Sequence, residues 1–522
     1  MATAPVRRRS LPHLALKDIP SWTIVRTVVG LAALVALSAY LRTQAFNAAF
    51  WIDEGLSYGI SSHHFFDIPS VLKQDGSPPL YYMTLHVWMG LFGTTEATTH
   101  TLSLIFALLT IPGGYWAGRS LFGERAGWCT AVLFALNSYL TTYAQETRMY
   151  SMLAFFTLIA AASFLHAFVF RRRRYLPVFS VAMALMLYTH NWAAFFIAAS
   201  LTTLVYVVWA SDERRALVRD AALSYGATLV LYAAWIPTLL FQVKHTGAPW
   251  STAPTFALLT KAPSMVLDGD RISYVLLLGA GAGLVAVIEK RRGALRTAMI
   301  AGLILFVGTL VWAWIGSQLS PAWAYRYFAV FVPPLLLIAG TGLAYARRLG
   351  LVALVIVAAF WLGFNAIEHK SIDRHVIRVA SPSLKAGDVV LVTHPEQVPV
   401  VDYYMPSGMR YATEFGFQKD PGVADWVDAL DRLKAATPSK DLAPVLATVP
   451  VGGHVLLMRP VIGGQAGWRA PWTKEVRIKS AQWTSAMSHD KSFKLTARWP
   501  KLRSGYAPRG LRALLYTRVQ PG

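Results

Sequence analysis

The chain has 522 residues, of which 55% are hydrophobic and 15% charged, and its mean hydropathy is +0.42. This composition excludes an ordinary soluble domain and indicates a polytopic α-helical membrane protein. The net charge of +22 does not imply nucleic acid, because arginine-rich cytoplasmic loops and a basic tail account for most of it. The single cysteine, Cys129, excludes an internal disulfide and argues against a thiolate metal cluster.

Residues 1–21 are polar and basic, so we see no cleavable signal peptide and expect a cytoplasmic N-terminal segment. From 22 to 367, which we assign to one transmembrane domain, apolar stretches of bilayer-spanning length alternate with short polar loops. The predicted spans are 22–42, 99–120, 126–143, 149–170, 176–191, 193–210, 221–241, 272–289, 297–317, 328–346 and 349–367.

The apolar segment 79–93 is short and aromatic, and the distribution of positive charge decides whether it spans. If it lies along the interface, all the arginine-rich loops fall on the side of the basic N-terminus, whereas a spanning segment would place them outside. These loops are 119–125, 171–174, 214–219, 290–296 and 347–348. The positive-inside rule therefore predicts eleven spans in a plasma membrane, with the N-terminus inside and the C-terminus outside.

With this topology, four polar loops collect on the external face: 43–98, 144–148, 242–271 and 318–327. Nearly all the unusual polar residues of the membrane half belong to them or to the outer end of the span that finishes at Thr189-His190-Asn191. Ionisable groups at a bilayer boundary mark functional sites more often than structural ones, so the clustering predicts an active site on this face.

The acidic pair Asp53-Glu54 is the foremost catalytic candidate. A structural interpretation is that one carboxylate caps a short helix beginning near Gly55. In a functional interpretation, one carboxylate is a general base and the other orients it or binds a metal. Adjacent carboxylates repel, which favours a nearby cation and raises one proton affinity.

Four further candidates lie in the external loops. Glu146 and Arg148 could form a local ion pair, or supply a second carboxylate and a phosphate clamp. Arg326, next to Tyr325, could snorkel to the interface or bind the phosphate of a lipid-linked donor. His190 is as often a hydrogen-bonded structural group as a ligand.

The turn Asp75-Gly-Ser-Pro-Pro leads rigidly into segment 79–93, which we expect to be an interfacial helix. Asp75 could cap that helix or reach the site. Tyr82 and its aromatic neighbours suit the headgroup layer, and we include Tyr82 among the substrate-binding candidates.

The order and spacing of these residues resemble those of the GT-C glycosyltransferases. The similarity covers about 22–367 and is strongest to the branch of bacterial dolichyl-phosphate-mannose-protein mannosyltransferases and lipid A aminoarabinose transferases. The matching elements are Asp53-Glu54, Pro78-Pro79-Leu80-Tyr81-Tyr82, Leu91-Phe92-Gly93, Gln145-Glu146-Thr147-Arg148-Met149-Tyr150, Tyr188-Thr189-His190 and Arg326-Tyr327.

The resemblance implies a polyprenyl-phosphate sugar donor and transfer on the non-cytoplasmic face. It also implies that Asp53 is the carboxylate that engages the acceptor hydroxyl and that external positive groups bind the donor phosphate. Many relatives carry a histidine just before Pro-Pro, where this chain has Ser77, so that role is unfilled unless His190 or His86 substitutes for it. Glu54 would orient Asp53.

The chemistry read from the residues agrees with this resemblance. A carboxylate assists a weak hydroxyl nucleophile, and Arg326 with Arg148 could stabilise the departing phosphate. We find no glycine-rich phosphate loop and expect no required cofactor, although a divalent metal at Asp53 and Glu146 is possible.

From about 368 to 522 we expect an extracytoplasmic α/β domain, with strands at 388–393 and 454–458 and helices over 396–404 and 423–435. After residue 441, thirteen Lys and Arg stand against two acids. This basic tail could be a solvated surface or contact anionic headgroups or envelope polymers. Trp472, Trp483 and Trp499 could stack on sugars or belong to the core.

The sequence thus predicts an inverting glycosyltransferase that moves a sugar, with mannose favoured, from a polyprenyl phosphate to an extracytoplasmic protein, lipid or glycan acceptor. The alternative is a transporter or flippase of a lipid-linked sugar, which would call for polar residues at mid-span and paired repeats. We find the polar residues at one face and no repeat.

Overall fold

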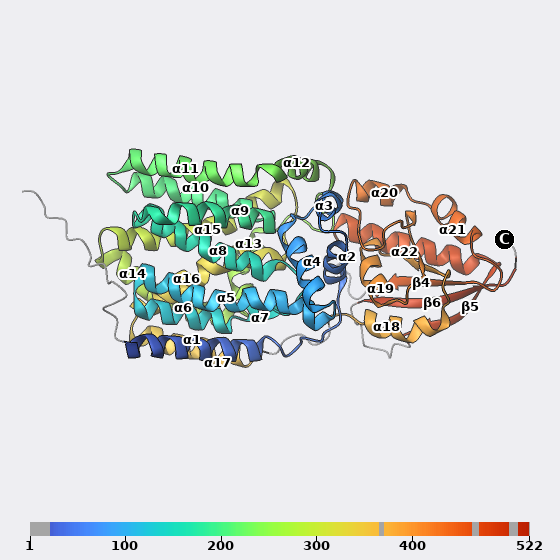
Figure 1. Cartoon of the computed structure of the whole chain (residues 1–522), viewed down its shortest axis with the longest axis horizontal. Helices are drawn as coiled ribbons and strands as arrows, with labels where there is room; N and C mark the ends of the chain where they lie inside the picture. The colour runs from blue at the N-terminus through green and yellow to red at the C-terminus, as the bar shows by residue number, and fades with distance from the viewer. Residues whose placement is uncertain (1–20, 365–369, 462–468, 501–509, 521–522) are drawn as a thin grey trace, which may run out of the picture.

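The computed structural model describes residues 21–364, 370–461, 469–500 and 510–520. It consists of a bundle of roughly antiparallel helices with a mixed α/β domain seated on one end (Figure 1). The predicted cytoplasmic segment 1–21 lies almost wholly outside the described residues, and so does the predicted domain boundary at 367–368.

A helix occupies each of the eleven segments predicted to span. They are α1 (Ser21–Leu41), α5 (Glu96–Phe122), α6 (Glu124–Leu136), α8 (Tyr150–Phe164), α9 (Leu176–Thr189), α10 (Ala193–Trp209), α11 (Arg214–Tyr232), α14 (Asp270–Lys290), α15 (Ala294–Leu319), α16 (Val332–Tyr345) and α17 (Arg348–Leu362). Within the described ranges, six helical stretches are long and apolar enough to cross a bilayer, and α10, α16 and α17 are shorter apolar helices.

The outer faces of the bundle are apolar, as lipid contact requires. Val230 on α11 and Leu278 on α14 expose 75% and 70% of their area, whereas small residues fill the contacts between helices. The prediction of a helical polytopic membrane protein is confirmed in this form.

The predicted span 126–143 is broken near its end. α6 stops at Leu136 and the short helix α7 (Ser138–Tyr143) follows. Asn137 causes the break, because its side-chain oxygen accepts from the Leu140 N–H at 3.1 Å and caps a new helix. Its amide also donates to the Val266 carbonyl at 3.0 Å, which fixes the kink in the bundle.

Short helices cover the end of the bundle that meets the α/β domain (Figure 1). They are α2 (Ile52–Ser61), α3 (Ile68–Asp75), α4 (Leu80–Phe92), α12 (Ile236–His245) and α13 (Phe256–Val266). The interfacial helix expected over 79–93 is α4. It begins directly after Pro79 without a side-chain cap, so Asp75 does not cap it.

The C-terminal domain is built on a six-stranded sheet in the order β3-β2-β1-β4-β6-β5, in which β1 runs parallel to β2 and β4 and the other pairs are antiparallel. The strands are β1 (Val389–Val392), β2 (Arg410–Thr413), β3 (Gly416–Phe417), β4 (His454–Pro460), β5 (Phe493–Trp499) and β6 (Leu511–Arg518). The helices are α18 (Asp373–Ala380), α19 (Val398–Tyr404), α20 (Ala429–Ala435), α21 (Ala443–Ala447) and α22 (Pro471–His489).

Both faces of the central strands are buried, which explains the continuous apolar runs in β1 and β4. Trp472 and Trp483 are also buried, at 2% and 0% exposure, so both belong to the core, while Trp499 is half-buried. The sequence predicted the strands at 388–393 and 454–458 and the helix over 396–404 correctly.

The helix predicted over 423–435 begins only at Ala429. The preceding residues use their backbone N–H groups to bind the membrane region instead: Trp426 donates to the Gln74 carbonyl and Asp428 to that of His245, both at 2.9 Å. These contacts replace the first turns of the expected helix.

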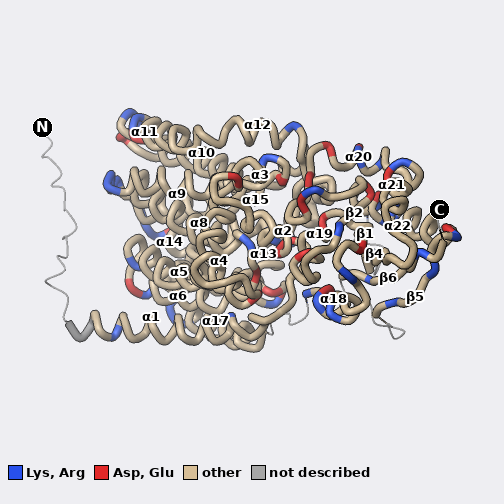
Figure 2. Tube along the Cα trace, turned by 45° about the vertical axis from the view of Figure 1, so that its right-hand side comes forward, with Lys and Arg blue, Asp and Glu red and all other residues tan. Residues whose placement is uncertain are grey.

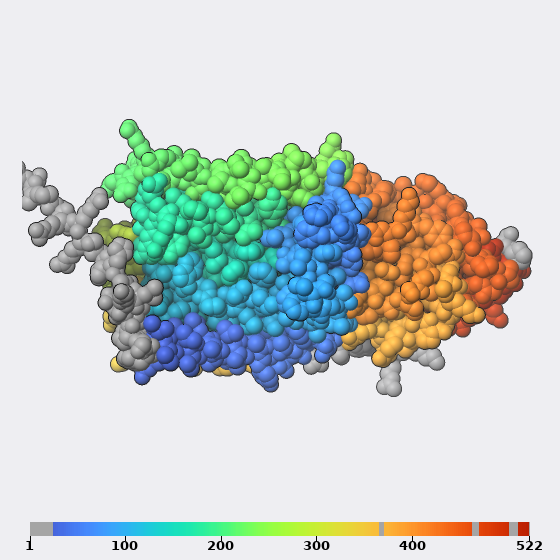
Figure 3. Space-filling view, in the orientation of Figure 1, coloured from blue at the N-terminus to red at the C-terminus, as the bar shows by residue number. Residues whose placement is uncertain are grey.

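The two regions meet over α2, which packs against α19. A side chain on Gly55 would place its Cβ 2.6 Å from Val400, so only glycine allows this approach. Ion pairs join His63 to Asp420 at 2.7 Å and Arg374 to Glu96 at 3.0 Å. In Figure 3 the C-terminal domain lies directly against the short helices of residues 52–92.

Candidate active site

The acidic pair lies inside the first turn of α2, which begins at Ile52, three residues before the predicted start. The Trp51 N–H donates to Glu54 Oε2 at 3.3 Å, so Glu54 caps this helix as the structural interpretation proposed for one of the two acids. Consecutive helical residues point about 100° apart. The two carboxylates therefore enter different surroundings.

Asp53 faces Arg326. Its Oδ2 lies 3.2 Å from Nε of Arg326, and the residue is 8% exposed. Arg326 belongs to the short helix Tyr325–Val330, and its guanidinium also stacks 4.7 Å from the ring centre of Trp250. Burial alone would lower the pKa of Arg326, but the Asp53 carboxylate and neighbouring tyrosines raise it above its usual value. The cation is thus permanent.

A second guanidinium approaches Asp53 from the other side. Arg148 Nη1 donates to the backbone carbonyl of Asp53 and to Ser57 Oγ, both at 3.0 Å, and lies 3.4 Å from the Tyr82 hydroxyl. Within the described residues no ion pair joins Arg148 to Glu146, so the local pair considered from sequence is replaced by contacts to α2. Tyr82 is buried on α4 and belongs to the same cluster.

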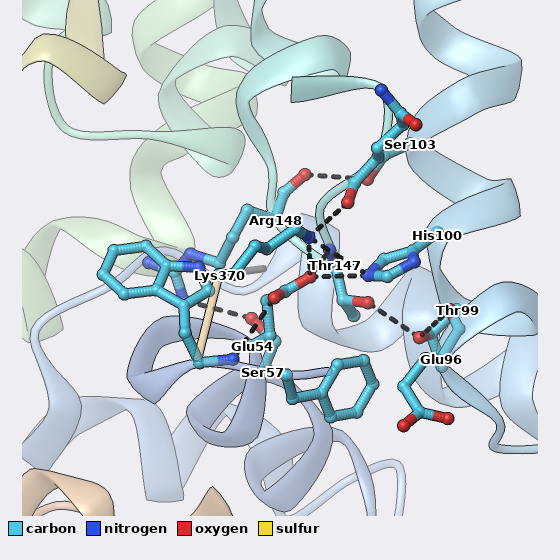
Figure 4. A network of polar contacts seen from close by, with 12 residues as sticks. Glu54, Ser57, Glu96, Thr99, His100, Ser103, Thr147, Arg148 and Lys370 are labelled. Atoms are coloured by element: carbon cyan, nitrogen blue, oxygen red, sulfur yellow. Dashed lines mark hydrogen bonds and ion pairs between the residues drawn. The ribbon is translucent and has the colours of Figure 1, made fainter. Parts of the chain in front are cut away.

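Glu54 is completely buried and joins several segments of the chain (Figure 4). Its Oε1 lies 2.6 Å from His100 Nε2 and accepts from the Thr147 N–H at 2.9 Å and from Lys370 Nζ at 3.0 Å. Burial would raise the pKa of Glu54, but Lys370, His100 and the Thr147 N–H outweigh it and lower that pKa to about 2. Glu54 is therefore an ionised anchor.

Glu146 has the opposite character. It is 8% exposed, and its Oε2 has no hydrogen-bond partner. Burial raises the pKa of Glu146 to about 8; Lys370 and Arg148 oppose this, while the negative charges of Glu54 and Asp53 add to it. At neutral pH this carboxyl holds its proton and offers an O–H donor.

His190 and Asp75 border the same cluster. His190 Nδ1 accepts from the Trp192 N–H at 3.1 Å, and its ring lies 4.5 Å from that of Tyr327. Burial raises the pKa of Asp75. Ser77 and Arg148 lower that pKa and Asp53 raises it, so this carboxyl interacts electrostatically with the site.

Tyr325 and His86 have their hydrogen-bonding atoms directed elsewhere. The Tyr325 hydroxyl donates to the Met265 carbonyl at 3.2 Å, and its ring packs 5.1 Å from that of Tyr139. His86 Nδ1 pairs with the Ser61 carbonyl at 2.9 Å. Of the two histidines considered as substitutes at Ser77, only His190 lies beside Arg148 and Arg326.

In the part of the chain that the structure describes, no three His, Cys, Asp or Glu side chains converge as metal ligands. Metal ligands must be deprotonated, and Glu146 keeps its proton near neutral pH, while Arg326 already occupies one oxygen of Asp53. These two acids fit a divalent ion poorly, and metal binding there stays an untested prediction.

Sequence reasoning missed His100 and Lys370. His100 stood at the start of a predicted span, where a histidine before an apolar run was the available signal. Lys370 follows the last apolar helix, and nothing in the local sequence pointed to the site. Its contact with Glu54 joins residues 316 positions apart.

Comparisons with known proteins concern the family and the fold of this chain. Residues 76–241 match the family model described as dolichyl-phosphate-mannose-protein mannosyltransferase. A search of curated protein sequences found no match.

Solved structures share the fold over nearly the whole chain. ArnT from Cupriavidus metallidurans in the apo state is 13% identical, with a TM-score of 0.58 over 95% of this chain and 98% of that one. The same protein bound to undecaprenyl phosphate is 14% identical, with a TM-score of 0.60 over 94% and 98%. Arabinofuranosyltransferase AftD from Mycobacteria is 15% identical, with a TM-score of 0.52 over 94% of this chain and 40% of that one. The chain thus shares the fold of ArnT, and its residues 76–241 match the dolichyl-phosphate-mannose-protein mannosyltransferase model; both findings confirm the resemblance found in its sequence.

Proposed function

We propose that this protein is a membrane glycosyltransferase that transfers a sugar, most simply mannose, from a polyprenyl phosphate to a hydroxyl acceptor outside the cytoplasm. The match of residues 76–241 supports mannose, and the undecaprenyl phosphate bound to the similar ArnT supports a lipid-phosphate donor. Eleven spans with the N-terminus inside would place the cluster around Asp53 and the C-terminal domain on the extracytoplasmic face.

One observation carries the proposal: a nearly buried carboxylate, Asp53, lies beside the buried guanidinium of Arg148 and the partly buried guanidinium of Arg326. Arg326 approaches its side chain at 3.2 Å, and Arg148 holds its backbone carbonyl at 3.0 Å. Buried charges cost free energy unless they are paired or used, and neighbouring charged groups in such a cluster are typical of catalytic sites. A base beside two phosphate-binding cations suits this transfer.

In the proposed reaction, Asp53 accepts the proton of the acceptor hydroxyl as the oxygen bonds to the anomeric carbon. The bond from that carbon to the phosphate oxygen breaks on the opposite face, so the configuration inverts. The lipid phosphate leaves with an additional negative charge. Arg326 and Arg148 stabilise this charge, since a guanidinium offers several N–H donors that a phosphate can share with Asp53.

The other residues of the cluster have supporting roles in this proposal. Glu146, which carries a proton at neutral pH, donates its O–H to a phosphate or sugar oxygen. Tyr82 and His190 line the approach beside Arg148, and Asp75 contributes a further acceptor for sugar hydroxyls. Tyr325 acts through its backbone connection to Arg326. Glu54 orients the turn that carries Asp53 and needs no contact with substrate.

The test is to incubate membranes with labelled polyprenyl-phosphate mannose or polyprenyl-phosphate arabinose, with and without the protein. We expect protein-dependent transfer of label from the mannose donor to an acceptor, and loss of transfer in Asp53→Asn. Transfer from the arabinose donor alone would refute mannose as the sugar. Passage of intact donor across the bilayer without transfer would favour the flippase and overturn the proposal.

A further inference from the structure

Lys370 connects the C-terminal region to the candidate site. It lies just before α18, and its side chain is only 10% exposed. Nζ contacts Glu54 Oε1 at 3.0 Å (Figure 4), and it donates to the backbone carbonyl of Gln145. A buried ammonium with two such acceptors is held in one position, because each lost contact would leave a desolvated charge.

We propose that Lys370 is a positioning residue for sugar transfer: it fixes the loop 144–149 against α2, so the C-terminal region completes the active site. The inference rests on the proposed function. It adds a residue that lies outside both the membrane helices and the region matched by the family model, which ends at 241.

Glu54 and Lys370 together hold the segments on which the site depends. Four donors from different segments meet the Glu54 carboxylate: the N–H groups of Trp51 and Thr147, the His100 ring and Lys370. His100 Nδ1 lies 2.8 Å from the Phe46 carbonyl, which can only accept, so Nδ1 carries a proton.

The charges around the Glu54 carboxylate give a second reason why Lys370 is needed. The negative charge of Glu54 raises the pKa of Glu146, and the positive charge of Lys370 lowers the pKa of both carboxyls. Arg148 and Arg326 make their close contacts with Asp53. Lys370 is the cation that acts on both carboxyls behind Asp53.

The consequence for the site follows from the short distance along the chain. Gln145, whose carbonyl Lys370 holds, immediately precedes Glu146, and Arg148 follows two residues later. Arg148 in turn binds the backbone of Asp53 at 3.0 Å. Loss of the Lys370 contact would let Glu146 and Arg148 move relative to Asp53, and displacements of about 1 Å can cost on the order of 100-fold in rate.

The experiment compares Lys370→Met with Lys370→Arg and with Lys385→Met, a matched control for an exposed lysine of the same domain. We expect Lys370→Met to lower kcat by about 10- to 100-fold, with KM for the lipid donor within about twofold of wild type. The fall of kcat at alkaline pH should move to higher pH in Lys370→Met, because the pKa of Glu146 rises further without the lysine. Lys370→Arg should recover most of kcat, and Lys385→Met should match wild type.

Hydrogen exchange gives a readout that does not depend on turnover. The amides of 144–149 should exchange faster in Lys370→Met than in wild type or Lys385→Met, while those of the β1 and β4 strands stay unchanged. Wild-type kcat and unchanged exchange in Lys370→Met would overturn the inference even if the enzyme transfers sugar. Exchange that rises throughout the protein, without rescue by Lys370→Arg, would overturn it in favour of a general stabilising role. If the wild-type protein shows no transferase activity but the 144–149 amides still exchange faster in Lys370→Met, the contact made by Lys370 is supported. That result would refute the proposed function instead.

Discussion

The two ends of the helix bundle use the same charged residue types in different ways (Figure 2). At the end far from the C-terminal domain, Asp220 receives Arg171 at 3.2 Å and Arg173 at 3.0 Å, and the Arg173 side chain is 56% exposed. At the other end, Arg148 is 8% exposed and contacts residues of two short helices, α2 and α4.

We interpret the arginines at the far end as membrane anchors and those around Asp53 as part of the active site. Arginines at the far end keep their charge in water, where ion pairs are worth about 0–1 kcal/mol and can be exchanged for lipid phosphates. Around Asp53, Arg148 is desolvated and the Arg326 side chain is 23% exposed, and each is held by several partners. The count of arginines is therefore a poor guide to the site, and the buried Arg148 is a better one.

Removing the two arginines beside Asp53 should have the largest effect. We expect Arg326→Met and Arg148→Met each to lower kcat by about 100- to 1000-fold, because a donor to the departing phosphate is lost. Arg173→Met at the far end is the matched control and should keep activity within twofold. Equal losses in all three variants, measured on detergent-purified protein, would show that burial does not distinguish the two ends.

The pH dependence of transfer should reveal Glu146. With its pKa at about 8, the protonated form is present below that pH and is lost as pH rises, so we expect kcat to fall above pH 8. Glu146→Gln keeps a hydrogen-bond donor and should remove this alkaline limb at a cost of about tenfold or less in kcat. An alkaline limb that persists unchanged in the glutamine variant would assign it to another group.

Asp220→Asn should affect stability and not turnover. Asp220 is completely buried, and without its charge Arg173 loses its ion pair while Arg171 keeps only that with Glu213. We expect a loss of about 1–3 kcal/mol in the free energy of unfolding, with unchanged kcat per folded molecule. A fall in kcat without loss of stability would contradict the division between the two ends.

The contact of His63 with Asp420 should give the smallest effect. Its hydrogen bond to Asp420 raises the pKa of His63, despite burial, so its stabilisation is complete below the unfolded-state value near 6.5 and is lost as pH rises through the raised pKa. The pair is partly exposed, and we expect Asp420→Asn to cost about 0.5–1 kcal/mol at pH 6 and less at pH 9. If thermal unfolding showed that the loss of stability in Asp420→Asn grows with pH, the expected pH dependence would be contradicted.

Much of the membrane fold could be predicted from the sequence, because hydropathy and arginine placement are local signals. They located all eleven helical segments and gathered Asp53, Arg148, His190 and Arg326 at one end. The break at Asn137 was missed because the capping amide stands inside an apolar run. The late start of α20 was missed because backbone bonds to Gln74 and His245 replace helical ones.

The environments of the acids could not be predicted. Asp53 and Glu54 are adjacent in sequence, yet one faces an arginine and the other a node of His100, Thr147 and Lys370. Those partners lie 46 to 316 residues away, beyond any local pattern. The same holds for Glu146, whose raised pKa follows from burial that the sequence of a short polar loop does not show.

The central claim is that Asp53 is the base, and the most direct measurement is single-turnover transfer by Asp53→Asn with labelled donor lipid bound. The substitution keeps the size of the side chain and removes its negative charge, and with it the ability to accept a proton. We predict donor binding within a few-fold of wild type and a rate of transfer lower by about 100- to 10,000-fold. Transfer at the wild-type rate by this variant would contradict the account.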